Sequence, residues 1–220
     1  MDRLAFVLAL ALGAAAAAAP RRATQRPTWP AITLEHLSTH ERFVLRPDPG
    51  GHLGARRLRG LTRFLRCHHT GQIHAIAARL PAVLYAVAHH FGDRAVEVIA
   101  GYRAPRIARE KGNPKSHHKE GRACDFRIDG VPLPTLRDYL RRSFGGIGVG
   151  YYPNAGFVHV DVGRKKRGFW TDYSSPGEKA RYTEDPPADE RPNRADEPSL
   201  PGPPAQAPTD ERHEGQDEQD

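Results

Sequence analysis

Cysteine is scarce in this sequence, which contains only Cys67 and Cys124 among its 220 residues. Two thiols are too few for a metal site built from cysteine alone. They leave two interpretations open. Export would permit a disulfide between Cys67 and Cys124, and the alternative is two buried free thiols.

Apolar runs long enough to cross a membrane are also missing. The longest apolar segment, Leu4–Ala19, follows Met1–Asp2–Arg3, precedes Pro20 and is shorter than the roughly 20 residues that a membrane helix needs. It predicts a signal peptide over residues 1–19. The alternative is an uncleaved N-terminal anchor, because Asp2 and Pro20 fit a cleaved signal poorly. Both interpretations place the body of the protein outside the cytoplasm, after a linker over residues 20–32 that is rich in Pro, Arg and Thr.

The C-terminal segment lacks large apolar residues. Leu200 is the only large apolar residue in the segment 184–220. This composition predicts a disordered, acidic and Pro-rich tail. Twelve acids and three arginines give the tail a net charge of −9, so the overall charge of +7 leaves +16 on residues 1–183. An exported protein rarely meets nucleic acid, so we expect an anionic polymer of the cell wall or outer surface as partner. A general excess of Arg would produce the same charge.

One domain is expected over residues 33–183. Apolar spacing predicts helices over 56–66, 80–91 and from Pro134 onward, and strands near 96–99, 122–128, 147–152 and 157–162. Helices followed by strands with one inserted helix indicate an α+β fold with a small antiparallel sheet and flanking helices. The polar residues 109–121 predict a long functional loop.

A candidate metal site combines His118 and Asp125 with a residue further along the chain. Gly121 lies between the first two and lets the backbone turn, so that both side chains can reach one point. Strand alternation places His159 and Asp161 on one face of a later strand. Two histidines and a carboxylate form a good ligand set for Zn²⁺. The competing interpretation is three ordinary polar residues on strands.

Five segments of the sequence carry a family resemblance: Leu65–Gly71, Gly101–Pro105, Ser116–Asp125, Gly148–Pro153 and Phe157–Gly163. Over roughly residues 33–172 the chain resembles the murein endopeptidase K-type zinc peptidases, in the superfamily of D-Ala-D-Ala metallopeptidases, lysostaphin-type enzymes and the hedgehog domain. The Ser-x-His-x6-Asp element is specific in combination with the later strand histidine. The resemblance implies a hedgehog/D,D-peptidase-like fold.

The resemblance also implies residue roles. His118, Asp125 and His159 would bind one Zn²⁺ per chain, and Arg103 would steady the substrate carbonyl or a nearby carboxylate. A guanidinium suits that role because it stays charged and offers several donors. Ser116 would hydrogen-bond a substrate peptide, or it caps the loop that carries His118.

The general base is where this chain departs from the family. Many relatives have Glu or His two or three residues before the last metal histidine, whereas Gly156 and Phe157 stand here. Asp161 is the candidate base, with the orientation of His159 as its alternative role. His117 and Glu120 are further candidates. Two other departures, Ala100 in place of Ser and the Lys-rich segment Lys111–Lys115, leave the substrate preference open.

These expectations combine into a bacterial periplasmic or secreted zinc peptidase that hydrolyses amide bonds in peptidoglycan stem peptides or cross-links. The sequence leaves open whether the bond is D,D or L,D, and which oligomeric state the protein has. One alternative is a non-catalytic zinc-containing module that binds the cell wall. A further alternative is a basic surface-binding protein. No membrane contact is expected beyond a retained N-terminal anchor.

Overall fold

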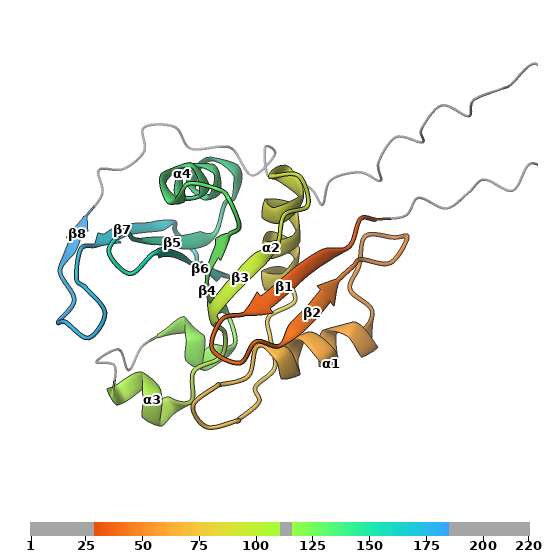
Figure 1. Ribbon diagram of the computed structural model, residues 1–220, viewed down its shortest axis with the longest axis horizontal. Coiled ribbons are helices and arrows are strands. Elements are labelled where there is room, and N and C mark those ends of the chain that lie inside the picture. Colours follow the sequence, from red (N-terminus) through yellow and green to blue (C-terminus); the bar gives the residue numbers. More distant parts are fainter. Residues whose placement is uncertain (1–28, 111–115, 185–220) are drawn as a thin grey trace, which may run out of the picture.

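Eight strands form one sheet in the part of the chain that the computed structural model describes, residues 29–110 and 116–184 (Figure 1). The predicted signal peptide, residues 20–28 of the linker, the segment Lys111–Lys115 and the tail from residue 185 lie outside the described residues. The strands are β1 (Ile32–His36), β2 (Arg42–Leu45), β3 (Val96–Ala100), β4 (Ala123–Ile128), β5 (Ile147–Tyr152), β6 (Phe157–Val162), β7 (Gly168–Asp172) and β8 (Tyr182–Glu184).

The sheet is larger than the small antiparallel sheet that the sequence predicts. Its strand order is β2-β1-β3-β4-β6-β5-β7-β8, and most neighbours are antiparallel. However, β1 pairs with β3 and β5 pairs with β7 in parallel. The first parallel pair arises because helices connect β1 and β2 to β3. The second arises because the chain leaves β6, passes β5 and adds β7 at the other side of β5. The α+β class is confirmed, and the predicted small antiparallel sheet is in fact an eight-stranded sheet that is mostly antiparallel.

The predicted helices are present. They are α1 (Ala55–Phe64), α2 (Arg79–His90) and α4 (Leu133–Ser143). In α2, Leu80, Val83, Leu84 and Val87 repeat at the spacing of one helix face and are buried. Pro81 lies in the first turn of α2, where a missing N–H costs little. Among the described residues, no helix combines the length and apolar composition needed to cross a membrane.

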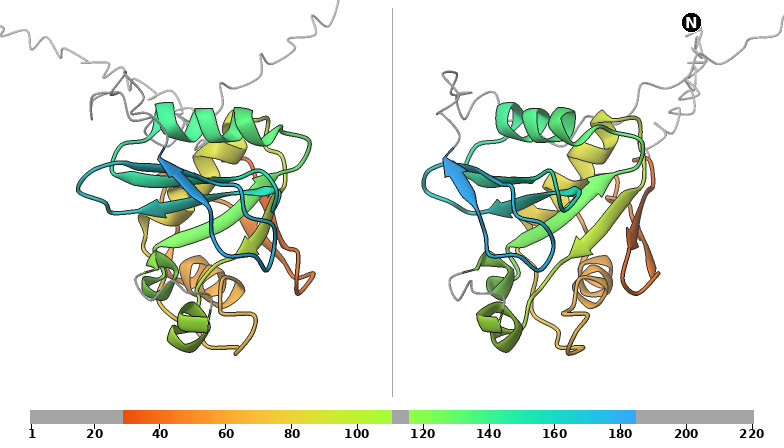
Figure 2. Two further views of the ribbon diagram at one scale, coloured as in Figure 1. Left: turned by 90° about the vertical axis from the view of Figure 1, so that its left-hand side faces the viewer. Right: turned by 60° about the vertical axis from the view of Figure 1, so that its left-hand side comes forward.

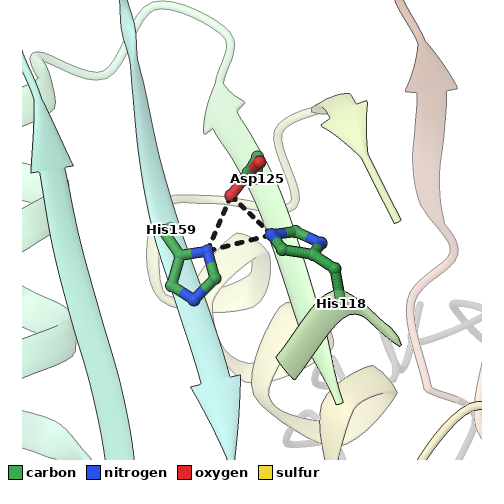
Figure 3. A group of neighbouring side chains, drawn as sticks. All are labelled: His118, Asp125 and His159. Carbon is green, nitrogen blue, oxygen red and sulfur yellow. Dashed lines mark hydrogen bonds and ion pairs between the residues drawn. The ribbon is translucent and has the colours of Figure 1, made fainter. Parts of the chain in front are cut away.

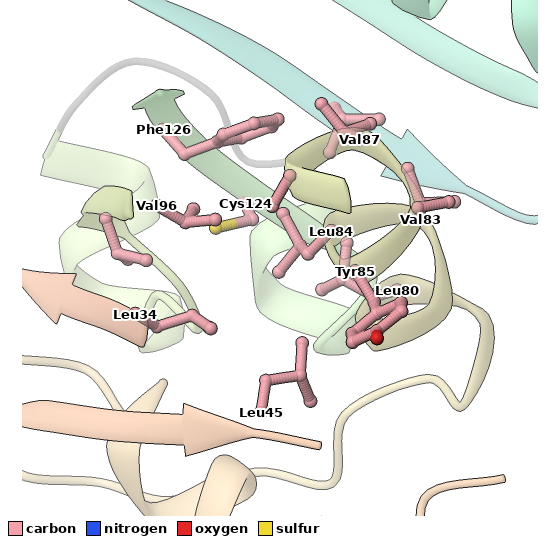
Figure 4. Close-up of a cluster of buried hydrophobic side chains, with 14 of the residues drawn as sticks. Leu34, Leu45, Leu80, Val83, Leu84, Tyr85, Val87, Val96, Cys124 and Phe126 are labelled. Carbon is pink, nitrogen blue, oxygen red and sulfur yellow. The ribbon is translucent and has the colours of Figure 1, made fainter. Parts of the chain in front are cut away.

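Helices α2 and α4 cover one face of the sheet (Figure 2). On that side the core contains Cys124 and Phe126 of β4, which are fully buried (Figure 4). Val158 and Val160 of β6 belong to the same core and are also fully buried. Successive side chains of a strand point to opposite faces. The residues between these apolar positions therefore face away from the two helices, which places Asp125 and His159 on the other side of the sheet.

The described ends of the segment 109–121, residues 109–110 and 116–121, contain regular elements where the sequence predicts a loop. Helix α3 (Pro105–Glu110) covers its start, and a 3₁₀ turn, η1 (His117–Glu120), lies directly before β4. Ser116 begins the turn by accepting a hydrogen bond from the His118 amide, and Gly121 ends it with a φ of 63°. A Cβ at Gly121 would lie 2.1 Å from the Ala75 carbonyl oxygen. The turn therefore requires glycine for both backbone conformation and space.

Candidate metal centre

Three buried side chains from three elements meet on the sheet face opposite α2 and α4. His118 comes from η1, Asp125 from β4 and His159 from β6 (Figure 3). Asp125 and His159 are direct cross-strand partners, so both side chains point the same way. The structure therefore brings together the three residues that the sequence predicts as ligands.

The donor atoms converge on one point. The Oδ1 atom of Asp125 lies 3.1 Å from Nε2 of His118 and 2.7 Å from Nδ1 of His159, and these two nitrogens are 3.1 Å apart. Donors at bond lengths of 2.0–2.1 Å around a tetrahedral Zn²⁺ are spaced about 3.3 Å apart. Shifts of a few tenths of an ångström would accommodate such an ion.

Hydrogen bonds to the outer nitrogens fix which ring atom faces the centre. The Nδ1–H of His118 donates to the carbonyl oxygen of Gly101 at 2.6 Å, because a carbonyl can only accept. The Nε2–H of His159 donates to Oδ2 of Asp161 at 3.1 Å. In the neutral rings, the two nitrogens that face each other therefore carry lone pairs beside a carboxylate. This arrangement fits a cation and is the usual way in which metal-binding histidines are oriented.

The charge states suit a metal site. Burial lowers the pKa of His118, which favours its neutral form. Burial alone would raise the pKa of Asp125, but the nearby His118 and His159 outweigh burial and hold this pKa well below its usual range. For His159, burial would lower the pKa, yet hydrogen bonds to Asp125 and Asp161 raise it. Protons therefore compete with a metal chiefly at His159.

Arg103 lies against the outer oxygen of Asp125. Its Nη2 donates to Oδ2 at 3.2 Å, and its side chain is 17% exposed. The backbone N–H of Arg103 also donates to the His118 carbonyl at 3.1 Å. Ser116 is buried, and its Oγ accepts from the His118 amide at 3.4 Å. The contacts of Ser116 thus correspond to the capping role rather than to an exposed substrate donor.

Asp161 is fully buried behind His159. Arg164 contacts both of its oxygens, with Nε–Oδ1 at 2.5 Å and Nη2–Oδ2 at 2.7 Å. Burial alone would raise the pKa of Asp161, but the hydrogen bonds from His159 and Arg164 outweigh it and hold the pKa far below its usual range. A carboxylate with so low a pKa and no exposed surface is poorly suited to accept a proton from water.

The other two candidate bases lie in η1. The Nε2 atom of His117 is 3.9 Å from Oδ1 of Asp161, and its Nδ1 is 3.6 Å from Oε2 of Glu120. Glu120 is more exposed and forms an ion pair with Arg122 at 2.9 Å. His117 therefore lies beside Asp161, and Glu120 lies beside His117.

The sequence did not predict two neighbours of the centre, Arg164 and Trp170. The ring of Trp170 lies 5.3 Å from that of His159, and its Nε1–H donates to the Tyr152 hydroxyl at 3.1 Å. The signal was present in the sequence, because Gly148 and Gly150 alternate within a strand. Glycines inside a strand often mark a place where another group approaches closely.

The two cysteines are free thiols in this structure, so the disulfide considered from sequence is not formed. Cys124 belongs to the core beneath α2, whereas Cys67 packs in a separate small cluster with Tyr102, Ala104 and Ile107. The two side chains therefore belong to different clusters. The structure agrees with the alternative that Cys67 and Cys124 are two buried free thiols.

Comparisons with known proteins agree on one family. A family model described as peptidoglycan L,D-endopeptidase MepK matches residues 23–168. The peptidoglycan L,D-endopeptidase MepK of Escherichia coli strain K12 is 36% identical over 162 residues, covering 70% of this chain and 88% of that protein. The probable peptidoglycan L,D-endopeptidase MepK of Haemophilus influenzae is 34% identical over 140 residues, covering 60% of this chain and 75% of that protein. No solved structure matches the chain significantly.

Proposed function

The chain belongs to the peptidoglycan L,D-endopeptidase MepK family, and from this premise we propose that it is a zinc-dependent endopeptidase of the bacterial cell wall. Its substrate would be an amide bond in peptidoglycan stem peptides or cross-links, with the L,D bond named for the relatives as the first candidate. The protein would act in the cell envelope, where this substrate is found. We also propose that the fold is hedgehog/D,D-peptidase-like.

One observation carries the proposal. His118, Asp125 and His159 direct three metal-binding atoms at one point, and each histidine has its other nitrogen occupied by an acceptor. Three protein ligands are the number that catalytic zinc sites use, since a further position must admit water or substrate. A bound Zn²⁺ would supply Lewis-acid chemistry, polarising the scissile carbonyl and making water more acidic.

The chain's own residues would perform the remaining tasks of hydrolysis. Water adds to the amide carbon, the C–N bond breaks, and a proton passes from the water to the departing amine. Arg103 would stabilise the negative charge that develops on the carbonyl oxygen, because its guanidinium is partly exposed and has donors beyond the one that Asp125 uses. Arg103 would also keep Asp125 in place while doing so.

For Asp161 we propose the orienting role rather than the role of base. Its contacts with His159 and Arg164 leave neither oxygen free, and its low pKa disfavours proton uptake. His117 and Glu120 are then the side chains to test as proton acceptors. Ser116 would stabilise η1 rather than hold substrate, consistent with its burial and its contact with the His118 amide.

The second candidate function is a metal-containing module that binds the cell wall without cutting it. One observation favours it, namely that the predicted base is held by Arg164 and shielded from solvent. A metal site alone does not establish catalysis, because related folds host different functions. The two candidate functions differ in whether an amide bond of peptidoglycan is cut.

The deciding experiment is digestion of purified sacculi by the full chain, with mass analysis of the released muropeptides. The proposal expects new amine and carboxylate ends at one type of bond, lost in His118→Ala. His52→Ala, which removes an exposed histidine of the loop before α1, serves as the matched control and should cut normally. Binding to sacculi without any new chain ends would favour the binding module.

A further inference from the structure

Four strands contribute to one row of side chains that begins at the metal centre. Asp125 of β4 pairs with His159 of β6, His159 pairs with Gly150 of β5, and Gly150 pairs with Trp170 of β7. Directly paired residues of neighbouring strands project from the same face. Trp170 therefore shares the face of the two ligands, although the matched family region ends at residue 168.

The row is continuous because Gly150 has no side chain. A Cβ at Gly150 would lie 2.6 Å from the Trp170 indole, which is closer than real Cβ contacts allow. The indole can thus lie over β5 and reach His159, with ring centroids 5.3 Å apart. The hydrogen bond from its Nε1 to the Tyr152 hydroxyl at 3.1 Å fixes the plane of the indole.

A second row runs parallel to the first and holds Arg164. Asp161 of β6 pairs with Gly148 of β5, which pairs with Gly168 of β7. A Cβ at Gly148 would lie 2.4 Å from Nε of Arg164 and 2.5 Å from Oδ2 of Asp161, and one at Gly168 would lie 2.8 Å from Nη1 of Arg164. The two glycines therefore leave the space that the guanidinium occupies.

Arg164 connects the two rows. It binds both oxygens of Asp161, and its Cζ lies 5.4 Å from the centroid of the Trp170 ring. Such a stacked, bidentate arrangement depends on a planar guanidinium and would not be reproduced by lysine. The Arg164 backbone N–H also donates to the Gly146 carbonyl at 2.9 Å, which holds the loop after β6 in place.

We propose that Arg164 and Trp170 are positioning residues that fix the imidazole of His159 for metal binding, Arg164 acting through Asp161 and Trp170 acting on the ring directly. The bidentate contact prevents the Asp161 carboxylate from rotating away from the Nε2–H of His159. That hydrogen bond selects the tautomer whose Nδ1 faces His118 and Asp125. The inference rests on the metal site of the proposed function but not on which bond is cut.

The test compares Arg164→Gln and Arg164→Lys with Lys165→Gln, which removes an exposed charge from the next position of the same loop. One readout is the dissociation constant of Zn²⁺ from the full chain, measured by competition with a chelator. Arg164→Gln should weaken binding about 10–100-fold, as loss of such a supporting partner usually does. Arg164→Lys should lose less, and Lys165→Gln should bind as the unchanged protein does.

Two further readouts report on His159 without any hydrolysis. The visible spectrum of the Co²⁺-loaded protein should change in Arg164→Gln and in Trp170→Phe, since ligand geometry sets its shape. In the metal-free protein at alkaline pH, where His159 is neutral, long-range ¹H–¹⁵N spectra should show His159 protonated at Nε2, and this single tautomer should be lost in Arg164→Gln. The last measurement keeps the inference testable even if the protein cuts no peptidoglycan.

Unchanged Zn²⁺ affinity, Co²⁺ spectrum and His159 tautomer in a folded Arg164→Gln protein would overturn the inference. If Arg164→Gln fails to fold, Arg164→Lys and Trp170→Phe decide by the same readouts. Normal metal binding combined with intact peptidoglycan would instead overturn the proposed function and leave the positioning role standing.

Discussion

The two faces of strands β4 and β6 are both buried, but in different ways. Towards α2 and α4 the strands present Cys124, Phe126, Val158 and Val160, which are buried by apolar contact. The opposite face presents Asp125, His159 and Asp161, which are buried by polar contact. Burying polar groups costs free energy unless each finds a partner. The apolar face therefore supplies stability, and the polar face depends on its hydrogen bonds.

His159→Ala should produce the largest change on the polar face. We expect metal content to fall from about one per chain to nearly none, because a donor atom is removed from a three-ligand set. Folding should survive, since Val158 and Val160 on the other face are untouched. Elemental analysis and thermal unfolding measure the two effects. Full metal occupancy in this variant would remove His159 from the ligand set.

Phe126→Ala should have the opposite effect, lowering stability but leaving metal binding intact. Phe126 is fully buried between the sheet and the helices, so its truncation leaves a cavity and should cost about 3–5 kcal/mol of unfolding free energy. Denaturant unfolding of the metal-free chain measures the loss. The fraction that remains folded should still bind one metal ion. A variant that kept its stability but lost metal would contradict the division of roles between the two faces.

Asp161→Asn separates orientation from proton transfer and should have a smaller effect than either change above. As an orienter, Asp161 should contribute about 10–100-fold to Zn²⁺ affinity, and activity should recover when excess metal is supplied. A turnover still reduced by about 10²-fold at saturating zinc would instead identify Asp161 as the base. The measurement is turnover of cross-linked muropeptides across a zinc titration.

The smallest effect is expected from the cysteines. Both are free and lie in separate clusters, so a reducing agent should leave the melting temperature of the full chain unchanged. A clear drop in melting temperature on reduction, absent in Cys67→Ser, would show that Cys67 and Cys124 pair in solution.

Periodicity made the two faces predictable. Alternating residues in β4 and β6 placed Asp125 opposite Cys124, and His159 on the same face as Asp161, as the structure has them. The helix predicted over residues 80–91 is α2, and Leu80, Val83, Leu84 and Val87 lie on its buried face. Such local patterns can be recognised in the sequence because each strand or helix must present an apolar face to the core.

What escaped prediction depends on contacts between distant segments. Strands β1 and β2 precede the first predicted helix, and β7 and β8 follow the last predicted strand. Their pairing is set by the sheet rather than by a strong local pattern. Arg164 and Trp170 lie outside the strands that the sequence predicts. Gly148 and Gly150 indicate only that another group approaches β5, and the register of β5 and β7 is needed to place Trp170 beside His159.

The most direct test of the metal centre is to strip the full chain of metal and add Zn²⁺ in steps while muropeptide release from sacculi is followed. We expect no release before zinc is added, then a rise in proportion to bound zinc that stops at one ion per chain. His118→Ala should show no such rise. Undiminished release by the metal-free chain would show that hydrolysis does not depend on a metal at this centre.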